Sequence, residues 1–515
     1  MAAHVSSWAV AAVLLFLLIR HLIAPGKKIR RDGEKLRKAP DTLPLVGNGL
    51  TFIQDRQKLF TWFTKAERMA DYETLELTVP SLPPGVLIHD PKNLEYIFKH
   101  EAIFSKGSFV KDRAWDLFGH GIINADGDMW RAQRKAGAAF LSTANLRVLQ
   151  DVALPKFLKD RIDYLKKRSD GKQVVDLQDV FHEITTQLMG KMAYNMEMHT
   201  NDDFTTAFDF ASGGTAERFQ NPLWFITEIF TGARLRKSVA IVKSYGDKIV
   251  SQAIKDRQQL SAPSKPDPTT TDLDQISGTL INSLLDAIPD KPTVADAALN
   301  YLSAGRDTTA QSLTWAFHLL MQTPGCLEEV RKEVNSLLPS SSPSDPIDLS
   351  LLTPQSLPYT LAVLYESLRL FPPIPMEIKQ LVSDQPATLP DGTVLPPNSV
   401  LVWCLWAMGR SVKTWGPGAE SFRPERWLAT DEKGKRTLVQ RSAAEFPVFN
   451  GGPRSCLGKK MAEGIAVMVI AAFARGFEFE ETEVEKGKLG AERTSKTSLT
   501  LPMDGGLNVR VRERR

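Results

Sequence analysis

The sequence predicts a mainly α-helical fold with small β-sheets (α+β), arranged as one large domain. Helical periodicity dominates from about residue 126 to 336, strand-like segments are few and short, and no internal repeat appears. The expected strands are Thr74–Val79, Val86–His89, Val400–Cys404 and Ser498–Pro502, with a hairpin joining the last to Leu507–Val511. These observations favour a single helical body with a minor sheet component over a string of modules.

Composition and charge exclude several classes of protein. The 515 residues are 43% hydrophobic and 24% charged, close to the globular average, so the chain is not disordered, collagen-like or a polytopic membrane protein. Of the net charge of +4, residues 20–38 supply +6, which leaves −2 for all the residues after them. Because a nucleic-acid-binding protein needs a basic face on its folded body, we expect no nucleic-acid partner.

Three cysteines are too few for a disulfide framework. Cys326, Cys404 and Cys456 include no pair with Cys-x-x-Cys spacing, and the sequence contains no Asn-x-Ser/Thr sequon. Both observations favour a reducing, cytosolic environment for most of the chain. Cys326 and Cys404 lie in no special local context and are expected to be ordinary free thiols.

The N-terminal segment has the composition of a membrane anchor. Residues 6–23 form an apolar run that would span about 27 Å as a helix, roughly the hydrocarbon thickness of an endoplasmic-reticulum bilayer. The positive charges follow this run, unlike those of a cleaved signal peptide, and a buried helix fits poorly beside so dense a charge cluster. We therefore expect a single-pass endoplasmic-reticulum anchor over residues 1–26 with a lumenal N-terminus, a basic, Pro/Gly-rich hinge over 27–47, and a cytosolic domain over 48–515.

The segment from Phe449 to Gly458, FNGGPRSCLG, carries the strongest chemical signal. Two glycines and a proline shape a tight loop, and a helix is expected to begin directly after Cys456. A thiol at a helix N-terminus lies near the positive end of the macrodipole, which favours the thiolate. Haem-thiolate ligation needs an anionic sulfur that is held rigidly, and Gly452 and Gly458 leave room for a flat macrocycle. The alternative is a buried free cysteine in a glycine-rich turn.

This loop resembles the haem-binding signature of the cytochrome P450 family, Phe-x-x-Gly-x-Arg-x-Cys-x-Gly, at every fixed position. Four other segments resemble family motifs in the expected order: Trp130–Arg134, Ala304–Thr309, Glu366–Arg369 and Phe422–Trp427. Together the motifs extend from about residue 40 to the C-terminus. The resemblance implies a cytochrome P450 fold of microsomal type in which haem b is bound through the Cys456 thiolate. Residues 48–515 would then form the catalytic domain.

The resemblance assigns proton delivery to Asp307 and Thr308. These residues lie on a helix expected over residues 293–323, long enough to cross a whole domain. Thr308 lies one turn from Ala304, so its hydroxyl can bond that backbone carbonyl and distort the helix, while Gly305 weakens the same region. Taken alone, the Asp-Thr-Thr cluster would fit a solvated helix equally well, but beside the cysteine loop it favours oxygen activation.

The remaining matched residues are expected to hold the haem and the fold around it. Glu366 and Arg369, one turn apart, would form a buried structural ion-pair triad with Arg426. The expected haem-binding residues are Trp130, Arg134 and Arg454 at the propionates, Phe449, Gly452 and Gly458 in the loop, and Lys379 where relatives usually carry an arginine.

The implied function is an NADPH-dependent monooxygenase that receives electrons from a separate membrane reductase, with cytochrome b5 as a further candidate partner. A membrane haem-binding or haem-sensing protein is the non-enzyme alternative, and an isomerase or dehydratase is the alternative within the fold. Neither needs a proton relay, so Asp307 and Thr308 favour the monooxygenase.

The substrate is expected to be apolar. Aromatic residues concentrate in residues 104–123 and 204–230, where family members line their pocket, although half of them fit a core equally well. The motifs are most similar to those of fungal and plant alkane and fatty-acid hydroxylases. A tailoring oxidase of fungal secondary metabolism, acting on a long-chain polyketide for example, is the alternative. The aromatic residues in question are Phe104, Phe109, Trp115, Phe118, Phe204, Phe208, Phe210, Phe219, Trp224, Phe225 and Phe230.

Overall fold

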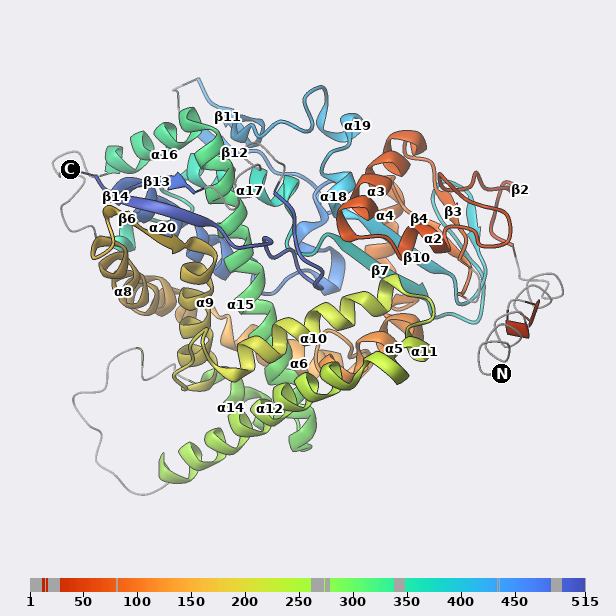
Figure 1. Cartoon of the computed structure of the whole chain (residues 1–515), viewed down its shortest axis with the longest axis horizontal. Helices are drawn as coiled ribbons and strands as arrows, with labels where there is room; N and C mark the ends of the chain where they lie inside the picture. The colour runs from red at the N-terminus through yellow and green to blue at the C-terminus, as the bar shows by residue number, and fades with distance from the viewer. Residues whose placement is uncertain are drawn as a thin grey trace, which may run out of the picture.

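The computed structural model describes residues 28–79, 82–260, 278–337, 348–432, 436–482 and 493–514, together with residues 12, 13, 15, 16, 273 and 434. Helices make up most of the molecule, and the small sheets are divided between its two ends: β1–β4 and β10 lie toward the N-terminus, and the β13-β14-β6 sheet lies near the C-terminus (Figure 1). The C-terminal strand and the first strands of the chain lie at opposite ends of the longest axis. The predicted α+β class, mainly helical with small sheets, is confirmed.

The helices are α2 (Gly49–Phe52), α3 (Arg56–Ala70), α4 (Pro91–Lys99), α5 (Gly107–Phe118), α6 (Gly127–Phe140), α7 (Thr143–Val148), α8 (Leu154–Lys166), α9 (Leu177–Tyr194), α10 (Asp203–Gln220), α11 (Trp224–Thr231), α12 (Ala233–Leu260), α14 (Thr279–Ala287), α15 (Lys291–Gln322), α16 (Pro324–Leu337), α17 (Pro358–Leu370), α18 (Leu405–Met408), α19 (Val412–Trp415) and α20 (Lys459–Gly476). A short π-helix (Leu149–Ala153) joins α7 to α8.

The strands are β1 (Arg30–Arg31), β2 (Glu34–Lys35), β3 (Leu75–Leu77), β4 (Gly85–Leu87), β5 (Phe104–Ser105), β6 (Asp170–Asp176), β7 (Met376–Leu381), β8 (Ala387–Thr388), β9 (Thr393–Leu395), β10 (Val400–Cys404), β11 (Leu428–Thr430), β12 (Arg436–Leu438), β13 (Phe477–Glu481) and β14 (Asn508–Glu513). They form sheets of order β2-β1-β9-β8, β3-β4-β10-β7-β5, β11-β12 and β13-β14-β6.

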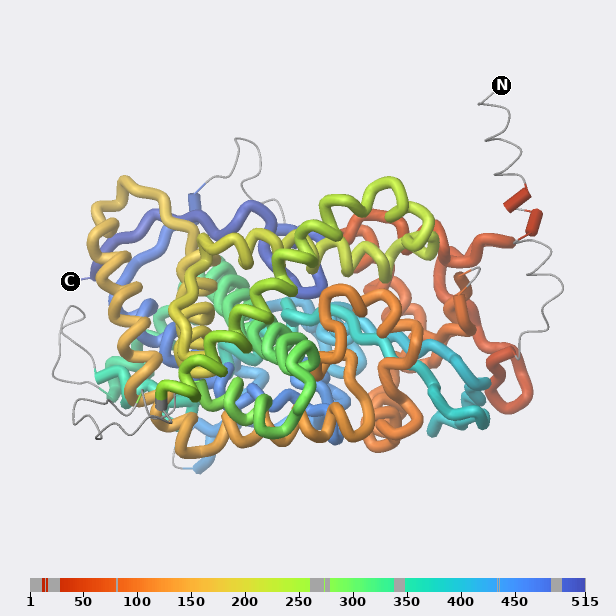
Figure 2. The backbone as a smooth tube through the Cα atoms, turned by 90° about the horizontal axis from the view of Figure 1, so that it is seen from below, coloured from red at the N-terminus to blue at the C-terminus, as the bar shows by residue number. Residues whose placement is uncertain are grey.

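Helix α15 is the axis of the molecule. Its N-cap, Asp290, accepts a hydrogen bond from the backbone N–H of Thr293, and Pro292 fits the first turn, where a missing N–H costs nothing. The helix contacts α9, α12, α17 and α20, and in the view from below it lies at the centre of the molecule (Figure 2). The helix predicted over residues 293–323 is therefore confirmed to within two residues at each end.

Three of the predicted strands are confirmed, as β3, β4 and β10, and they lie side by side in the five-stranded sheet. β10 runs parallel to β4 and antiparallel to β7, and Leu401 pairs with Lys379. This sheet brings β7, which follows α17, against the N-terminal part of the chain. It thereby places residues from both halves of the sequence around one site.

The predicted hairpin between Ser498–Pro502 and Leu507–Val511 is wrong. The second segment belongs to β14, which pairs with β13 and β6 instead. Residues 498–502 form no strand because their backbone groups find side-chain partners. Arg56 donates to the carbonyls of Ser498 and Thr500, and the amide of Leu501 donates to Gln311.

No helix among the described residues is long and apolar enough to cross a membrane. The anchor predicted over residues 1–26 lies almost entirely outside the described residues. Part of the predicted hinge is folded, because β1 pairs with both β2 and β9. The basic segment therefore enters the body of the protein through the four-stranded sheet.

Candidate active site

A chamber of about 460 Å³ separates the cysteine loop from the middle of α15. Its lining includes the predicted residues Trp130, Arg134, Asp307, Thr308, Phe449, Arg454, Cys456 and Gly458. Segments more than 300 residues apart in sequence are therefore assembled around one space. Gly452, Lys379 and the triad residues are not among those that line it.

The backbone of the loop holds Cys456 in place. The amide N of Cys456 donates to the carbonyl O of Phe449 at 2.8 Å, which closes the turn before α20 begins. Gly452 has a φ of +61°, and a Cβ on it would lie 2.2 Å from the carbonyl oxygen of Phe98. The reason for this glycine is therefore packing against α4, and the sequence-based explanation, room for a macrocycle, is wrong for Gly452.

Gly458 does face the chamber. A Cβ on Gly458 would meet no atom closer than Cys456 Sγ at 3.9 Å, so only the space in front of the sulfur would be filled. Neither packing nor a positive φ requires a glycine at this position. Gly458 lies directly beside a thiol that opens onto the chamber, and the two residues leave a space that a flat ligand can occupy. This observation fits a haem ligated by Cys456.

Burial opposes the thiolate of Cys456 that is expected from its place at a helix N-terminus. Burial raises the pKa of the Cys456 thiol, and the backbone N–H groups of Gly458 and Lys459 and the guanidinium of Arg134 act in the opposite direction without overcoming it. The residue is exposed on the chamber side and enclosed by protein elsewhere. A thiol in this setting becomes a thiolate when it coordinates a metal, because coordination deprotonates it outright.

Positive charge gathers at one rim of the chamber. Arg134 Nη1 donates to the carbonyl O of Ser455 at 2.8 Å. The guanidinium of Arg454 lies 4.8 Å from the centre of the Trp130 ring and donates to Glu101 Oε1 at 2.6 Å. Trp130, Arg134 and Arg454 all line the chamber, as the sequence predicted, and Arg454 also donates to Asp126 and to the carbonyl O of Ala125. Guanidinium and indole N–H groups are donors that the carboxylate groups of a macrocycle can use.

Lys106 is a chamber residue that the sequence interpretation missed. It precedes α5 and forms an ion pair with Glu377 of β7, which also lines the chamber. Lys379, which was predicted at the propionates, is buried in the same strand and pairs in register with Leu401. Burial, and then the nearby Lys106, lower its pKa to about 8. Of these two lysines, only Lys106 reaches the chamber.

The opposite wall of the chamber is formed by α15. Thr308 Oγ1 donates to the carbonyl O of Ala304 at 2.8 Å, which confirms the predicted hydroxyl bond. The helix is nevertheless continuous through this point. A Cβ on Gly305 would lie 2.6 Å from Met189 Sδ of α9, so this glycine permits close packing of the two helices. Asp307 lies between Arg306 and His182 and is almost fully buried.

The predicted triad is confirmed behind the loop. Arg369 Nη2 and Arg426 Nε lie 2.7 and 2.9 Å from Glu366 Oε1, and Trp427 Nε1 donates to Glu366 Oε2 at 2.9 Å. Although burial alone would raise the pKa of Glu366, the hydrogen bond and charge of Arg369 hold it below its ordinary value. Arg369 also donates to the backbone carbonyls of residues 409, 419 and 421, so the triad orders the segment that precedes the cysteine loop.

The aromatic lining predicted for the pocket is largely wrong. Of the residues proposed, only Phe118 and Phe208 line the chamber. Others lie in the core, as Phe104 and Phe204 do, or are exposed. The apolar lining comes mainly from aliphatic side chains on several separate segments, which no local pattern in the sequence connects. These include Ile122, Ile123, Leu364, Leu368, Ile374, Leu405, Val448, Leu457 and Leu499.

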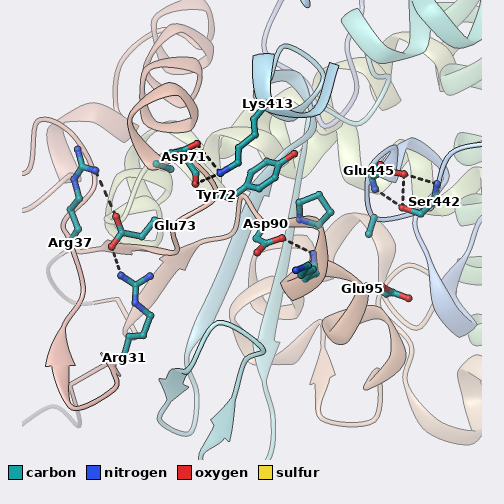
Figure 3. Close-up of a pocket in the computed structure, with 14 residues that line it drawn as sticks. Arg31, Arg37, Asp71, Tyr72, Glu73, Asp90, Glu95, Lys413, Ser442 and Glu445 are labelled. Atoms are coloured by element: carbon teal, nitrogen blue, oxygen red, sulfur yellow. Dashed lines mark hydrogen bonds and ion pairs between the residues drawn. The ribbon is translucent and has the colours of Figure 1, made fainter. Parts of the chain in front are cut away.

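A larger hollow of about 1040 Å³ lies beside the end of α3 and the start of α4, and several of the charged side chains that line it are paired with one another (Figure 3). Arg31 and Arg37 contact Glu73, and Lys413 Nζ lies 2.8 Å from Asp71 Oδ1. Because these groups already satisfy one another across an open surface, we assign the chemistry to the smaller chamber.

A cysteine sulfur that faces an Asp-Thr segment across an apolar chamber, with guanidinium groups at one rim, defines the class of haem-thiolate proteins. The comparisons with known proteins agree. The family model described as cytochrome P450 matches residues 38–503. The chain belongs to the cytochrome P450 family, and it is an oxidoreductase.

Individual relatives share about three residues in ten with this chain. Cytochrome P450 94A1 of Vicia sativa is 29% identical over 491 residues, which cover 92% of this chain and 90% of the relative. Cytochrome P450 94C1 of Arabidopsis thaliana is 30% identical over 484 residues, with 90% of each chain covered. Cytochrome P450 monooxygenase cyp1 of Mycosarcoma maydis is 28% identical over 517 residues, covering 96% of this chain and 78% of the relative.

Proposed function

We propose that this cytochrome P450 hydroxylates a long-chain apolar substrate, a fatty acid or an alkane, by inserting one oxygen atom from O2. The observation that carries the proposal is the aliphatic lining of the chamber between Cys456 and α15. An unbranched chain can lie against such a surface without leaving a polar group unpaired. The likeness of the motifs to fungal and plant alkane and fatty-acid hydroxylases supports the same substrate class.

The residues divide the work of this reaction. Cys456 would ligate the iron, while Arg134, Arg454 and the Trp130 indole would hold the propionates. Haem, when bound, supplies oxygen activation and accepts the electrons for it. Thr308 and Asp307 would hold protons beside the reacting oxygen, and the aliphatic wall excludes water from the substrate. Because an isomerase has no use for such protons, this pair favours the monooxygenase.

The proposed electron source is NADPH through a separate reductase, with cytochrome b5 as a second candidate donor. We propose that the enzyme is held in the endoplasmic-reticulum membrane by residues 6–23, with the domain after residue 27 in the cytosol. The order of charge after the apolar run supports this orientation. A substrate that concentrates in the bilayer would be available to an enzyme anchored there.

Titration of the holoenzyme with saturated fatty acids from decanoic to eicosanoic acid tests the proposal. Each methylene buried contributes about 0.8 kcal/mol, so affinity should rise roughly fourfold per carbon until the chamber is filled and then level off. The measurement is the change in haem absorbance that accompanies displacement of water. Short-chain acids, which bury little apolar surface, serve as the control.

A tailoring oxidase of secondary metabolism is the alternative within this family. If no fatty acid of the series perturbs the haem spectrum while a rigid polycyclic or polyketide compound does, the hydroxylase proposal fails and the tailoring activity replaces it.

A further inference from the structure

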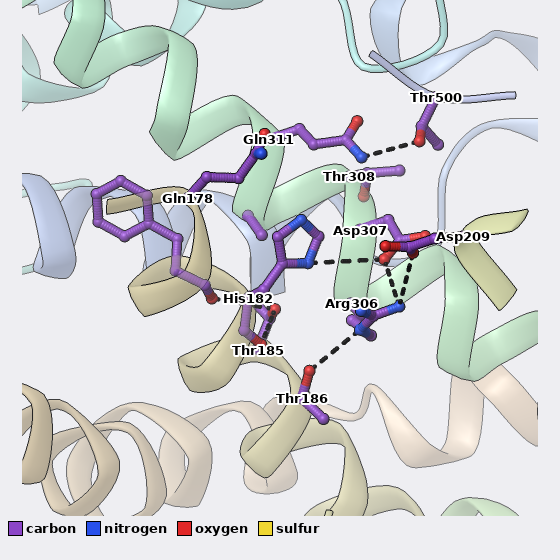
Figure 4. Close-up of polar contacts among 12 residues, drawn as sticks. Gln178, His182, Thr185, Thr186, Asp209, Arg306, Asp307, Thr308, Gln311 and Thr500 are labelled. Atoms are coloured by element: carbon purple, nitrogen blue, oxygen red, sulfur yellow. Dashed lines mark hydrogen bonds and ion pairs between the residues drawn. The ribbon is translucent and has the colours of Figure 1, made fainter. Parts of the chain in front are cut away.

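A second cavity adjoins the chamber and differs from it in chemistry. It has a volume of about 600 Å³ and is lined by residues of α9, α10 and α15, by Thr200 and Asn201, and by residues between 496 and 502. Figure 4 shows the polar contacts among several of them. Most of the lining residues are polar or charged, among them Gln178, Asp179, His182, Asp209, Arg306 and Lys496. We refer to it as the polar cavity. Ser212, Asp307 and Thr500 line both spaces, so the polar cavity meets the chamber at Asp307.

Three buried polar atoms converge at this meeting point without hydrogen-bond partners. They are His182 Nδ1, Arg306 Nη1 and Asp307 Oδ1. Asp307 Oδ1 lies 3.0 Å from Arg306 Nη1 and 3.7 Å from His182 Nδ1. Buried polar groups are nearly always satisfied, by ordered water where protein partners are missing, and a buried water needs two to four polar partners. The three atoms together meet that requirement.

The position of Arg306 is fixed by contacts on two other helices. Its Nε donates to Thr186 Oγ1 of α9 at 3.2 Å, and its Nη1 lies 3.7 Å from Asp209 Oδ1 of α10. Arg306 is only 2% exposed, whereas Asp209 is half-exposed on the side of the polar cavity. The guanidinium therefore connects the carboxylate at the open side with Asp307 at the inner wall.

We propose that the polar cavity is the route by which solvent protons reach Asp307, with His182 and Arg306 positioning water against its carboxylate. The inference rests on the proposed monooxygenase function and names a route that the family motif itself does not contain. A cavity water gives a proton to Asp307 Oδ1 and at the same time takes one from the next water on the solvent side, so no hydroxide is left behind. The carboxylic acid then releases its proton on the chamber side, near Thr308. Only O–H bonds form and break, and the electrons of the reaction come from NADPH.

The pKa values of Asp307 and His182 are shifted in the directions that this proton route requires. Burial raises the pKa of Asp307 to about 6, with Asp209 adding to the rise and Arg306 opposing it. A group with such a pKa both accepts and releases a proton near neutral pH. Burial, with help from Arg306 and Lys496, lowers the pKa of His182 well below its ordinary value. The imidazole is therefore neutral and can orient water as a donor or an acceptor.

Substitution of His182 tests the route in the holoenzyme supplied with NADPH and a reductase, with dodecanoic acid as the probe substrate. His182→Phe keeps the ring volume and removes the polar atom. We expect product formation to slow at least about tenfold, short of the ~10²–10⁴-fold that a direct proton donor contributes, and the solvent deuterium isotope effect on it to increase. His182→Asn, which keeps a polar atom near the Nδ1 position, should restore most of the rate.

His318→Phe is the matched control. His318 lies on α15, is 14% exposed against 12% for His182, and contacts Glu481 far from the polar cavity. It should leave both the rate and the isotope effect unchanged. If His182→Phe behaves like His318→Phe, the route is wrong, whereas absence of oxidation by the wild-type enzyme with every probe would contradict the proposed function instead.

A crystal structure of the wild-type holoenzyme provides a test that does not depend on turnover. We expect an ordered water within hydrogen-bonding distance of at least two of the three atoms, His182 Nδ1, Arg306 Nη1 and Asp307 Oδ1. A dry contact between these side chains would overturn the proposal, even if His182→Phe failed to fold.

Discussion

At the floor of the chamber, the backbone and not the side chain of Cys456 fixes the position of the sulfur. The hydrogen bond from its amide to Phe449 and the positive φ of Gly452 shape the loop, and the thiol itself opens onto the chamber. Replacing this side chain therefore disturbs little packing. A substitution here separates ligand chemistry from folding.

We predict that Cys456→Ser abolishes the thiolate-type absorption of the carbon-monoxide complex and all substrate oxidation. A serine hydroxyl offers iron no anionic sulfur. Circular dichroism should show an unchanged helix content. Cys326→Ser is the matched control, because Cys326 is half-buried away from the chamber and should keep both the absorption and the activity. Oxidation by the Cys456→Ser protein at the wild-type rate would contradict the ligand assignment.

The role of a residue could be predicted from the sequence where one short motif contains both the functional side chain and the groups that it contacts. Cys456 and Arg454 occupy the same loop, and Thr308 lies one helical turn from the carbonyl that it bonds. Lys106 could not be found in this way, because its partner Glu377 is 271 residues away and only the five-stranded sheet brings them together. Lys379, two residues beyond Glu377, lies about 7 Å further along the same strand.

At the scale of elements, two structures hold the site: α15 above the chamber and the segment between α17 and the cysteine loop below it. The first is fixed by close helix packing, in which Gly305 allows contact with Met189. The second consists of short strands and the short helices α18 and α19, and it depends on Glu366, which accepts hydrogen bonds from Arg369, Arg426 and Trp427. A buried carboxylate with so many partners makes this segment sensitive to a single substitution.

We predict that Glu366→Gln lowers the free energy of unfolding by about 3–5 kcal/mol, because it leaves Arg369 buried without its counter-charge. Loss of haem should accompany the change, measured as haem bound per protein after purification. Since the pKa of Glu366 is lower in the folded protein than its ordinary value of 4.5, its stabilising effect is present above that pH. It is lost as pH falls through the folded pKa.

The control for this prediction is Glu95→Gln. Glu95 forms an ion pair with Lys99 on the surface, where both side chains are more than half exposed, and such pairs contribute about 0–1 kcal/mol. The acid sensitivity of wild-type unfolding should persist in Glu95→Gln and shrink in Glu366→Gln. Equal haem retention in the two variants would show that the triad does not hold the site.

Elements with strong local periodicity were predictable, and those that depend on side-chain partners were not. The long central helix and three strands follow from periodicity alone. Residues 498–502 have the composition of a strand, but Arg56, more than 400 residues away in sequence, satisfies their carbonyls. No local sequence pattern reveals that a distant side chain will bind these backbone carbonyls.

At the scale of the whole molecule, apolar surface is exposed on segments other than the predicted anchor. Ile229 and Phe230 of α11 are 68% and 82% exposed, and Leu45 and Ile53, near α2, are 62% and 58% exposed. Single exposed apolar residues are normal, but several on short segments favour contact with another apolar phase. We therefore expect the proposed anchor and this surface to make separable contributions to membrane binding.

We predict that deletion of residues 1–26 releases the haem-loaded protein from membranes incompletely. The deletion removes the apolar run over residues 6–23, which supplies most of the hydrophobic transfer energy, whereas the basic segment after residue 27 and the side chains of α11 still contact the bilayer. Flotation of the purified protein with vesicles of phosphatidylcholine and phosphatidylserine measures the bound fraction.

High salt should remove the electrostatic part of the binding, and Ile229→Ser with Phe230→Ser in the truncated protein should remove the rest. The same two substitutions in the full-length chain are the control and should leave it bound. Binding of the truncated protein that survives both salt and carbonate washing would show that residues 6–23 are not the principal anchor.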